Sequence, residues 1–216
     1  MDPETFNALQ QVRKMDQFEW YIIFMFVVVL YVYFSLVKEK NFNAIFSALT
    51  LYTIHWFVEI INALICHFTG NALWAVPDGS GFVFLVGVGA ELSFMFMIAG
   101  VVQTKLLPDD PKTKILGLPA PLAIGLGNAV LASVLEIFLA RTNAFYWAYW
   151  PWWSTWSVFL TVYIPFFVVA AYAYYWKRKT QIWFLVIGAI INIGMLIGFS
   201  LVPWLLAGRA YMSWWI

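Results

Sequence analysis

Long apolar runs recur along the whole chain, and they limit most strongly what it can fold into. Six runs each hold about 20 mostly apolar residues, the length a helix needs to cross the ~30 Å hydrocarbon core of a bilayer. The composition agrees, because 63% of the residues are hydrophobic and only 11% are charged, against about 25% charged residues in soluble domains. We therefore expect an all-α fold, a polytopic membrane helical bundle.

The breaks between the runs predict six transmembrane helices in a single integral membrane domain over residues 1–216. The expected spans are 19–37, 43–67, 82–104, 119–140, 152–175 and 182–206. Turn-forming and charged residues separate them, as in the stretch Pro77-Asp78-Gly79 after the second run. The segment before the first run is charged and lacks the apolar core of a signal peptide, so we expect it to form a short N-terminal interfacial helix.

The basic residues predict how the bundle lies in the membrane. The side reached after odd-numbered spans carries eight of them: Lys38, Lys40, Lys105, Lys112, Lys114, Lys177, Arg178 and Lys179. The other side carries four: Arg13, Lys14, Arg141 and Arg209. The positive-inside rule makes the richer side cytoplasmic and puts both termini on the non-cytoplasmic side. We expect a multi-pass protein of a bacterial inner membrane or an ER-like membrane.

Net charge and cysteine content exclude several classes of protein. The formal net charge of +1 gives no basic field for a nucleic-acid partner. A single cysteine excludes an intrachain disulfide or a cysteine-based metal cluster. We predict no cofactor.

A polar stripe interrupts the second apolar run. His55, Glu59, Asn62 and Cys66 are spaced by four, three and four residues, which puts them on one helical face. A charged side chain at the bilayer centre costs about 2.5–3.5 kcal/mol on insertion scales, so an intramembrane carboxylate marks a functional site by default. The stripe is therefore the first candidate site.

Two further acids, Glu91 and Glu136, lie in apolar runs, and the predicted orientation puts both in the same outer half of the membrane as Glu59. A bundle that buries these acids would enclose a polar pocket open to the outer side. The residues expected to line it and bind substrate are Asn62, Glu136, Asn128, Trp56, Asn192 and Trp153.

Simpler structural roles stay open for several of these residues. Glu136 lies five residues before Arg141 and can pair with it near the interface. Asn128 and Asn192 have the character of interhelical hydrogen-bonding residues. The tryptophans gathered on the outer side, including Trp74 and Trp147, form either an anchoring belt or the aromatic mouth of a pocket.

Buried carboxyl groups with a histidine one turn away suit proton transfer. Such an acid in an apolar pocket can protonate an alkene, while aromatic rings and a second carboxylate stabilise the resulting cation. In this interpretation Glu59 is the acid, His55 its proton partner and Glu91 the second acid or base. A weaker alternative is a metal site with His55, Glu59, Glu91 and Glu136 as ligands. The motifs of serine hydrolases, P-loop proteins and zinc proteases are absent from the sequence.

The pattern His55-x-x-x-Glu59, followed by Glu91, resembles the emopamil-binding (EXPERA) family of sterol isomerases. The resemblance implies an intramembrane pocket in which the histidine and the two acids move a proton across a sterol double bond. A second likeness, carried by Lys38-Glu39-Lys40 and Glu59, is to the integral-membrane terpene cyclases of meroterpenoid pathways. Both imply a hydrophobic lipid or isoprenoid ligand and a role in lipid metabolism.

The expected function is that of an integral membrane enzyme, an isomerase, cyclase or hydratase, acting by carboxylate and histidine acid–base chemistry on a lipidic substrate. A proton-coupled carrier is the first alternative, although the inner halves of the runs are almost wholly apolar and favour a one-sided pocket over a pore. The second alternative is a metal-binding or non-catalytic subunit of a membrane complex. A homo-oligomer is compatible with each of these.

Overall fold

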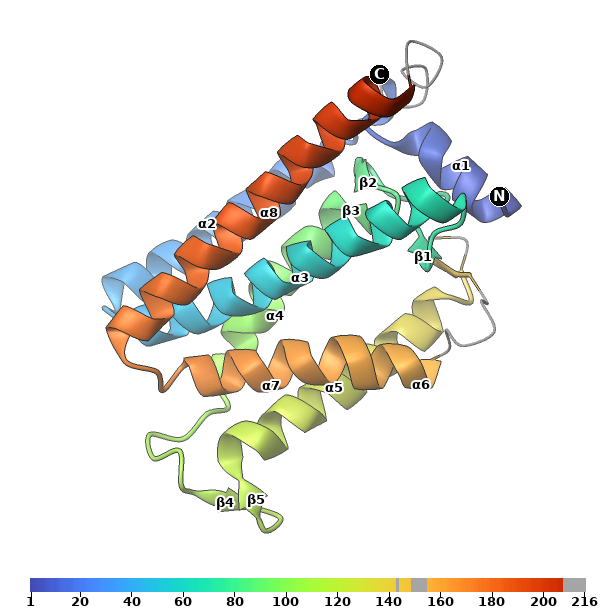
Figure 1. The fold of residues 1–216 in the computed structure, drawn as a ribbon. Coiled ribbons are helices and arrows are strands. Elements are labelled where there is room, and N and C mark those ends of the chain that lie inside the picture. The colour runs from blue at the N-terminus through green and yellow to red at the C-terminus, as the bar shows by residue number, and fades with distance from the viewer. Residues whose placement is uncertain (143, 149–154, 208–216) are drawn as a thin grey trace.

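The computed structural model describes residues 1–142, 144–148 and 155–207, and this part of the chain is mostly helical (Figure 1). Within it, five helical segments are long and apolar enough to cross a membrane. Four are the helices α2 (Tyr21–Lys38), α3 (Phe42–Thr69), α5 (Ala120–Leu139) and α8 (Arg178–Ala207). The fifth joins α6 (Thr155–Val158), a π-helical turn η2 (Phe159–Tyr163) and α7 (Ile164–Ala173). The helical bundle expected from the apolar runs is therefore present.

The third of the six predicted spans is not confirmed, because the apolar run at 82–104 is only partly helical. Its helix α4 (Ala90–Thr104) has 15 residues, too few to be counted as a span. The residues before it form a hairpin of β2 (Val83–Leu85) and β3 (Val88–Gly89). Hydropathy cannot tell a short apolar strand from a buried helix segment, which is why the sequence predicted a helix here.

α4 nevertheless runs parallel to α2 along much of its length. At one end the Tyr21 hydroxyl donates a hydrogen bond to Glu91 in the first turn of α4. At the other end Lys105 Nζ lies 3.4 Å from Glu39 Oε2, just beyond the last residues of the two helices. The β2–β3 hairpin and α4 together therefore fill the place of a full-length helix beside α2.

Three loops meet at one end of the bundle, which we call the basic end: residues 39–41, 105–119 and 174–177. Besides the Lys105–Glu39 pair, Arg178 Nη2 donates to Asn43 Oδ1 at 3.0 Å, and the Tyr175 hydroxyl donates to the carbonyl oxygen of Pro108. α1 and strands β1–β3 gather at the opposite end, which we call the α1 end (Figure 1). The three loops richest in lysine and arginine therefore share one end; which side of a membrane it faces stays a prediction.

Close helix contacts are made where glycines replace larger residues. A Cβ atom added to Gly100 of α4 would lie 2.8 Å from the Ala48 Cα of α3, and one added to Gly125 of α5 would lie 2.7 Å from the Val168 Cα of α7. Any side chain at either position would push the helices apart. α3 and α7 are thus the central helices, and α4 and α5 pack closely against them.

Buried polar side chains in the half nearer the basic end fasten other helices to α7. Ser47 Oγ of α3 donates to the carbonyl of Ala170 at 2.7 Å. The side-chain amides of Gln103 and Gln181 likewise donate to carbonyls of α7, at 2.9 and 2.8 Å. All three are hydrogen bonds from a polar side chain outside α7 to a backbone carbonyl of α7.

Short helices and strands cover the α1 end of the bundle. Strand β1 (Trp74–Ala75) pairs antiparallel with β6 (Tyr146–Trp147), so that Trp74 lies opposite Trp147. The predicted N-terminal helix is present as α1 (Pro3–Gln11), followed by the 3-10 turn η1 (Met15–Gln17), and it packs on β1 with Ala8 fully buried. Its placement at a membrane interface stays a prediction. A second hairpin, of β4 (Lys114–Ile115) and β5 (Leu118–Pro119), lies at the basic end.

Candidate functional site

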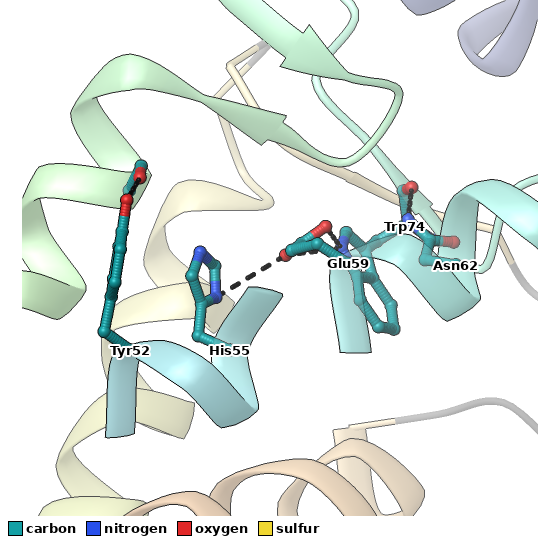
Figure 2. A network of polar contacts seen from close by, with 6 residues as sticks. Tyr52, His55, Glu59, Asn62 and Trp74 are labelled. Atoms are coloured by element: carbon teal, nitrogen blue, oxygen red, sulfur yellow. Dashed lines mark hydrogen bonds and ion pairs between the residues drawn. The ribbon is translucent and has the colours of Figure 1, made fainter. Parts of the chain in front are cut away.

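His55 and Glu59 lie one turn apart on α3 and are both almost completely buried (Figure 2). His55 Nδ1 is 3.9 Å from Glu59 Oε1, and the imidazole stacks on Phe96 of α4 with ring centroids 4.3 Å apart. His55 Nε2 has no hydrogen-bond partner among the described residues. A buried imidazole nitrogen without a partner costs free energy, so it is the kind of group that a ligand or a water molecule satisfies.

Trp74 of strand β1 holds the Glu59 carboxyl group. Its indole Nε1 lies 3.2 and 3.0 Å from the two carboxyl oxygens of Glu59 (Figure 2). Trp74 is placed by Asn62, whose Nδ2 donates to the Trp74 carbonyl at 2.8 Å and whose Oδ1 accepts from the Leu73 amide at 2.8 Å. Asn62 stands one turn after Glu59, so one face of α3 carries both the acid and the clamp that brings Trp74 to it.

Gly87, at the turn of the β2–β3 hairpin, packs against both Asn62 and Trp74. A Cβ atom there would lie 2.3 Å from Asn62 Nδ2 and 2.5 Å from Trp74 Nε1, distances that real atoms do not adopt. The hairpin that replaces the start of the third predicted span therefore closes over Trp74 and Asn62.

Glu136 supplies the second acid, from the last turn of α5. Its side chain is 7% exposed, it forms a side-chain hydrogen bond with Trp147, and it interacts electrostatically with Glu59. Trp147 and Trp74 are the cross-strand pair of β6 and β1, and directly opposed side chains lie on the same face of an antiparallel pair. One two-stranded ribbon therefore presents two indoles, and each meets one of the two carboxyl groups.

These groups surround a small buried cavity of about 10 Å³. Its lining is His55, Glu59, Trp74, Phe96, Glu136, Val158, Val162, Tyr163 and Phe166. The volume is close to the minimum that holds one water molecule, and the lining supplies the polar partners that such a water needs.

The wall of the cavity opposite α3 includes the π-helical turn η2. Val162 and Tyr163 belong to it, and Pro165 lies two residues after its end. Proline has no backbone N–H, so the carbonyl four residues earlier cannot make its α-helical bond, which favours a widened turn at this point. Such π-turns are frequent at functional sites.

Glu91, predicted as the second catalytic group, lies elsewhere. Besides the Tyr21 hydroxyl, Ser80 Oγ lies 2.6 Å from Oε2 and the Gly81 amide lies 2.6 Å from Oε1, both as donors. The carboxylate thus joins α2, the loop before β2 and the first turn of α4. Glu91 does not line the cavity, and its catalytic role stays a prediction.

The other expected binding residues are spread over the fold. Trp56 packs edge-on to His55 but is absent from the cavity lining. Asn128 donates to the carbonyl of Ile124 in its own helix, whereas Asn192 of α8 donates to the carbonyl of Thr53 in α3, the interhelical bond considered for it. Trp153 lies outside the described residues.

Two of the simpler alternatives can also be compared with the structure. Among the residues that the structure describes, no ion pair joins Glu136 to Arg141, and Arg141 is exposed. Within the same residues, no three His, Cys, Asp or Glu side chains stand together as a metal ion would require, so a metal site has no support here.

Sequence reasoning found the two acids and the histidine but not the groups that hold them. Trp74 and Trp147 were interpreted only as interfacial or mouth residues, and Phe96, Tyr163 and Phe166 were not singled out. Pro165 is the only local signal for the π-turn, and the pairing of β1 with β6 joins segments more than 70 residues apart.

Comparison with known proteins assigns the chain to a family and corrects the resemblances suggested by its motifs. A family model described as an uncharacterized membrane protein family matches residues 2–201. A protein of Archaeoglobus fulgidus, described only as uncharacterized, is 38% identical over 171 residues, which cover 78% of this chain and 81% of that protein. No solved structure matches.

The expected resemblance to the EXPERA sterol isomerases and to the terpene cyclases is therefore wrong, since neither family is matched. A four-residue spacing puts any two polar residues on one helical face, so the pattern His55-x-x-x-Glu59 occurs in many unrelated helices and does not identify a family. The sterol and isoprenoid substrates implied by those families lose their basis. The chain belongs to the membrane protein family whose model spans residues 2–201.

Proposed function

We propose that this protein is an integral membrane enzyme that performs acid–base chemistry on a membrane-soluble substrate, with Glu59 and Glu136 as the proton-transferring groups. The observation that carries the proposal is the convergence of these two carboxyl groups and the unpartnered His55 Nε2 on one buried cavity. Two neighbouring ionised carboxylates in a buried cavity repel each other and lose their hydration, so the pair is suited to hold and exchange a proton.

The surroundings favour chemistry that passes through a cation. The rings of Phe96, Phe166 and Tyr163 line the cavity beside the two acids, and aromatic faces attract positive charge. The cavity of about 10 Å³ admits only a group of about the size of a water molecule. The reacting carbons of a substrate would therefore reach the acids only when the lining side chains move apart and widen the cavity.

An isomerisation illustrates the proton balance. The Glu59 O–H bond breaks as its proton forms a C–H bond at one carbon of a carbon–carbon double bond, which leaves positive charge on the neighbouring carbon. Ionised Glu136 then removes a proton from the next carbon, and the double bond reforms one position along. His55, 3.9 Å from Glu59, relays the proton back from Glu136 to Glu59 and resets the pair.

Solvent deuterium tests this function even while the substrate is unidentified. The purified protein in lipid nanodiscs would be incubated in deuterated buffer with a lipid extract of its native host, and the lipids analysed by mass spectrometry. Proton transfer to carbon leaves deuterium at positions that do not exchange during extraction. We expect one or more lipid species to gain deuterium with the unaltered protein and not with Glu59→Gln or Glu136→Gln.

Glu39→Gln, at the exposed basic end, is the matched control and should retain incorporation. Glu91→Gln tests the acid that lies outside the cavity and should also retain it. Full incorporation by Glu59→Gln would sink the assignment. If no lipid gains deuterium but proteoliposomes show a proton flux that Glu59→Gln abolishes, the two acids serve a carrier and the enzyme proposal fails.

A further inference from the structure

The β4–β5 hairpin exposes an apolar tip outside the membrane-spanning helices. Leu116 is 97% exposed, and Ile115 and Leu118 beside it are 37% and 40% exposed. Exposed apolar residues on the spanning helices face lipid tails by their position. The tip lies outside all the segments long and apolar enough to span, so that explanation does not cover it.

The backbone conformation of this turn is unfavourable for leucine. Leu116 and Gly117 have φ of 53° and 81°, and positive values at both central residues define the type I′ hairpin turn. Asn or Asp followed by Gly suits this turn, whereas leucine is disfavoured in the left-handed region. The chain therefore keeps leucine at a position that is unfavourable both for its backbone and for its contact with water. A surface that removes this side chain from water would offset the cost.

Chain connectivity places the tip at the membrane boundary. The Ala120 amide, at the first residue of α5, donates to the Thr113 carbonyl at 2.7 Å, so the hairpin is tied directly to the start of a spanning helix. Figure 1 shows the hairpin beyond the first turn of α5, away from α2, α3 and α8. An element so close to a spanning helix and beside the bundle lies over lipid.

Charge around the hairpin fits a lipid surface better than an apolar protein partner. Lys112 and Lys114 are exposed beside the tip, and Lys105 stands at the other end of the same loop. Asp109 and Asp110 lie farther from the tip, and Asp110 Oδ1 accepts from the Lys112 amide at 2.9 Å within the loop. Lysines beside an apolar tip match the anionic headgroups and the acyl boundary beneath them.

We propose that the β4–β5 hairpin is a lipid anchor, which inserts Leu116 below the headgroups of an anionic leaflet while Lys112 and Lys114 contact the phosphates. The inference is independent of the chemistry proposed for the buried cavity. It makes the basic end a site that responds to lipid composition.

Site-specific labelling tests the anchor directly. The chain has one cysteine, Cys66, which is 5% exposed, so Leu116→Cys can be labelled selectively with an environment-sensitive fluorophore. In nanodiscs of phosphatidylcholine and phosphatidylglycerol, the label should emit as in an apolar medium and be quenched by lipids spin-labelled near the headgroup. The same label at Asp109→Cys, in the same loop, should report water.

A water-like emission from position 116 in both pure phosphatidylcholine and mixed nanodiscs would overturn the proposal. Protection of the label only when two copies share a nanodisc would also overturn it, because a second copy would then cover the tip. Leu116→Asn separates anchoring from folding, since asparagine suits the type I′ turn. This variant should be at least as stable as the unaltered protein in detergent but lose most of the stabilisation that anionic lipid gives. Equal stabilisation of both would contradict the anchor.

Discussion

Asn62 is predicted to hold the candidate site together although it does not line the cavity. It is fully buried, and it binds the backbone of residues 73 and 74 through both ends of its amide. Replacement by alanine removes the acceptor of the Leu73 amide and the donor to the Trp74 carbonyl. The clamp that brings the Trp74 indole to Glu59 is then lost.

The size of the effect follows from these two bonds. A buried amide that loses its acceptor costs about 1–3 kcal/mol, and the bond to the Trp74 carbonyl contributes about 0.5–1.5 kcal/mol net. Asn62→Ala should therefore lower the free energy of unfolding by about 1.5–4.5 kcal/mol. Asn128→Ala is the matched control, because the hydrogen bond of Asn128 within the described residues goes to the Ile124 carbonyl of its own helix, and it should change stability by less than about 0.5 kcal/mol.

Unfolding in mixed micelles of a mild detergent and dodecyl sulfate, followed by circular dichroism, gives both free energies. In the folded state, Asn62→Ala should also give a weaker near-ultraviolet signal from immobilised tryptophan, because Trp74 is no longer held in place. An Asn62→Ala variant no less stable than Asn128→Ala, with an unchanged tryptophan signal, would refute the reasoning.

Three further predictions concern other parts of the fold. Gly87→Ala should destabilise the protein by about 1–3 kcal/mol through overpacking, whereas Gly127→Ala, where a Cβ meets no atom within 4 Å, should be neutral or stabilising in the same unfolding assay. Glu91→Gln removes a carboxylate that accepts three hydrogen bonds and should speed amide exchange in residues 80–89, measured by mass spectrometry, while exchange at the basic end stays unchanged. Burial raises the pKa of Tyr175 from 10 to about 12, so its neutral form favours the folded state. Its contribution to stability is complete below pH 10 and is lost as the pH rises toward 12, and this part of the pH dependence should be absent from Tyr175→Phe.

The sequence was informative about the fold wherever hydropathy alone decides the structure. Apolar runs predicted helices that match α2, α3, α5 and α8 closely, because a segment surrounded by lipid must satisfy its own backbone. The run at 82–104 was wrong in its first eight residues. The hairpin there packs closely at Gly87 against Asn62 and Trp74, and such a contact leaves no mark on local hydropathy.

The candidate site was predictable in its acids and not in its architecture. Buried carboxylates are expensive, so Glu59, Glu91 and Glu136 stand out in any apolar run. Depth alone could not decide which two share a cavity. That depends on the β1–β6 pairing, which brings Trp147 beside Trp74, and a two-residue pairing between distant loops leaves no periodic signal.

The central claim is that the carboxyl groups of Glu59 and Glu136 occupy one cavity and interact. Infrared difference spectroscopy of the protein in nanodiscs, recorded across a pH titration, measures this directly. We predict that Glu136→Gln removes one carboxyl band and also shifts the band assigned to Glu59, and that Glu59→Gln does the converse. If each variant removes its own band and leaves the other unmoved, the two acids do not form a pair and the account is contradicted.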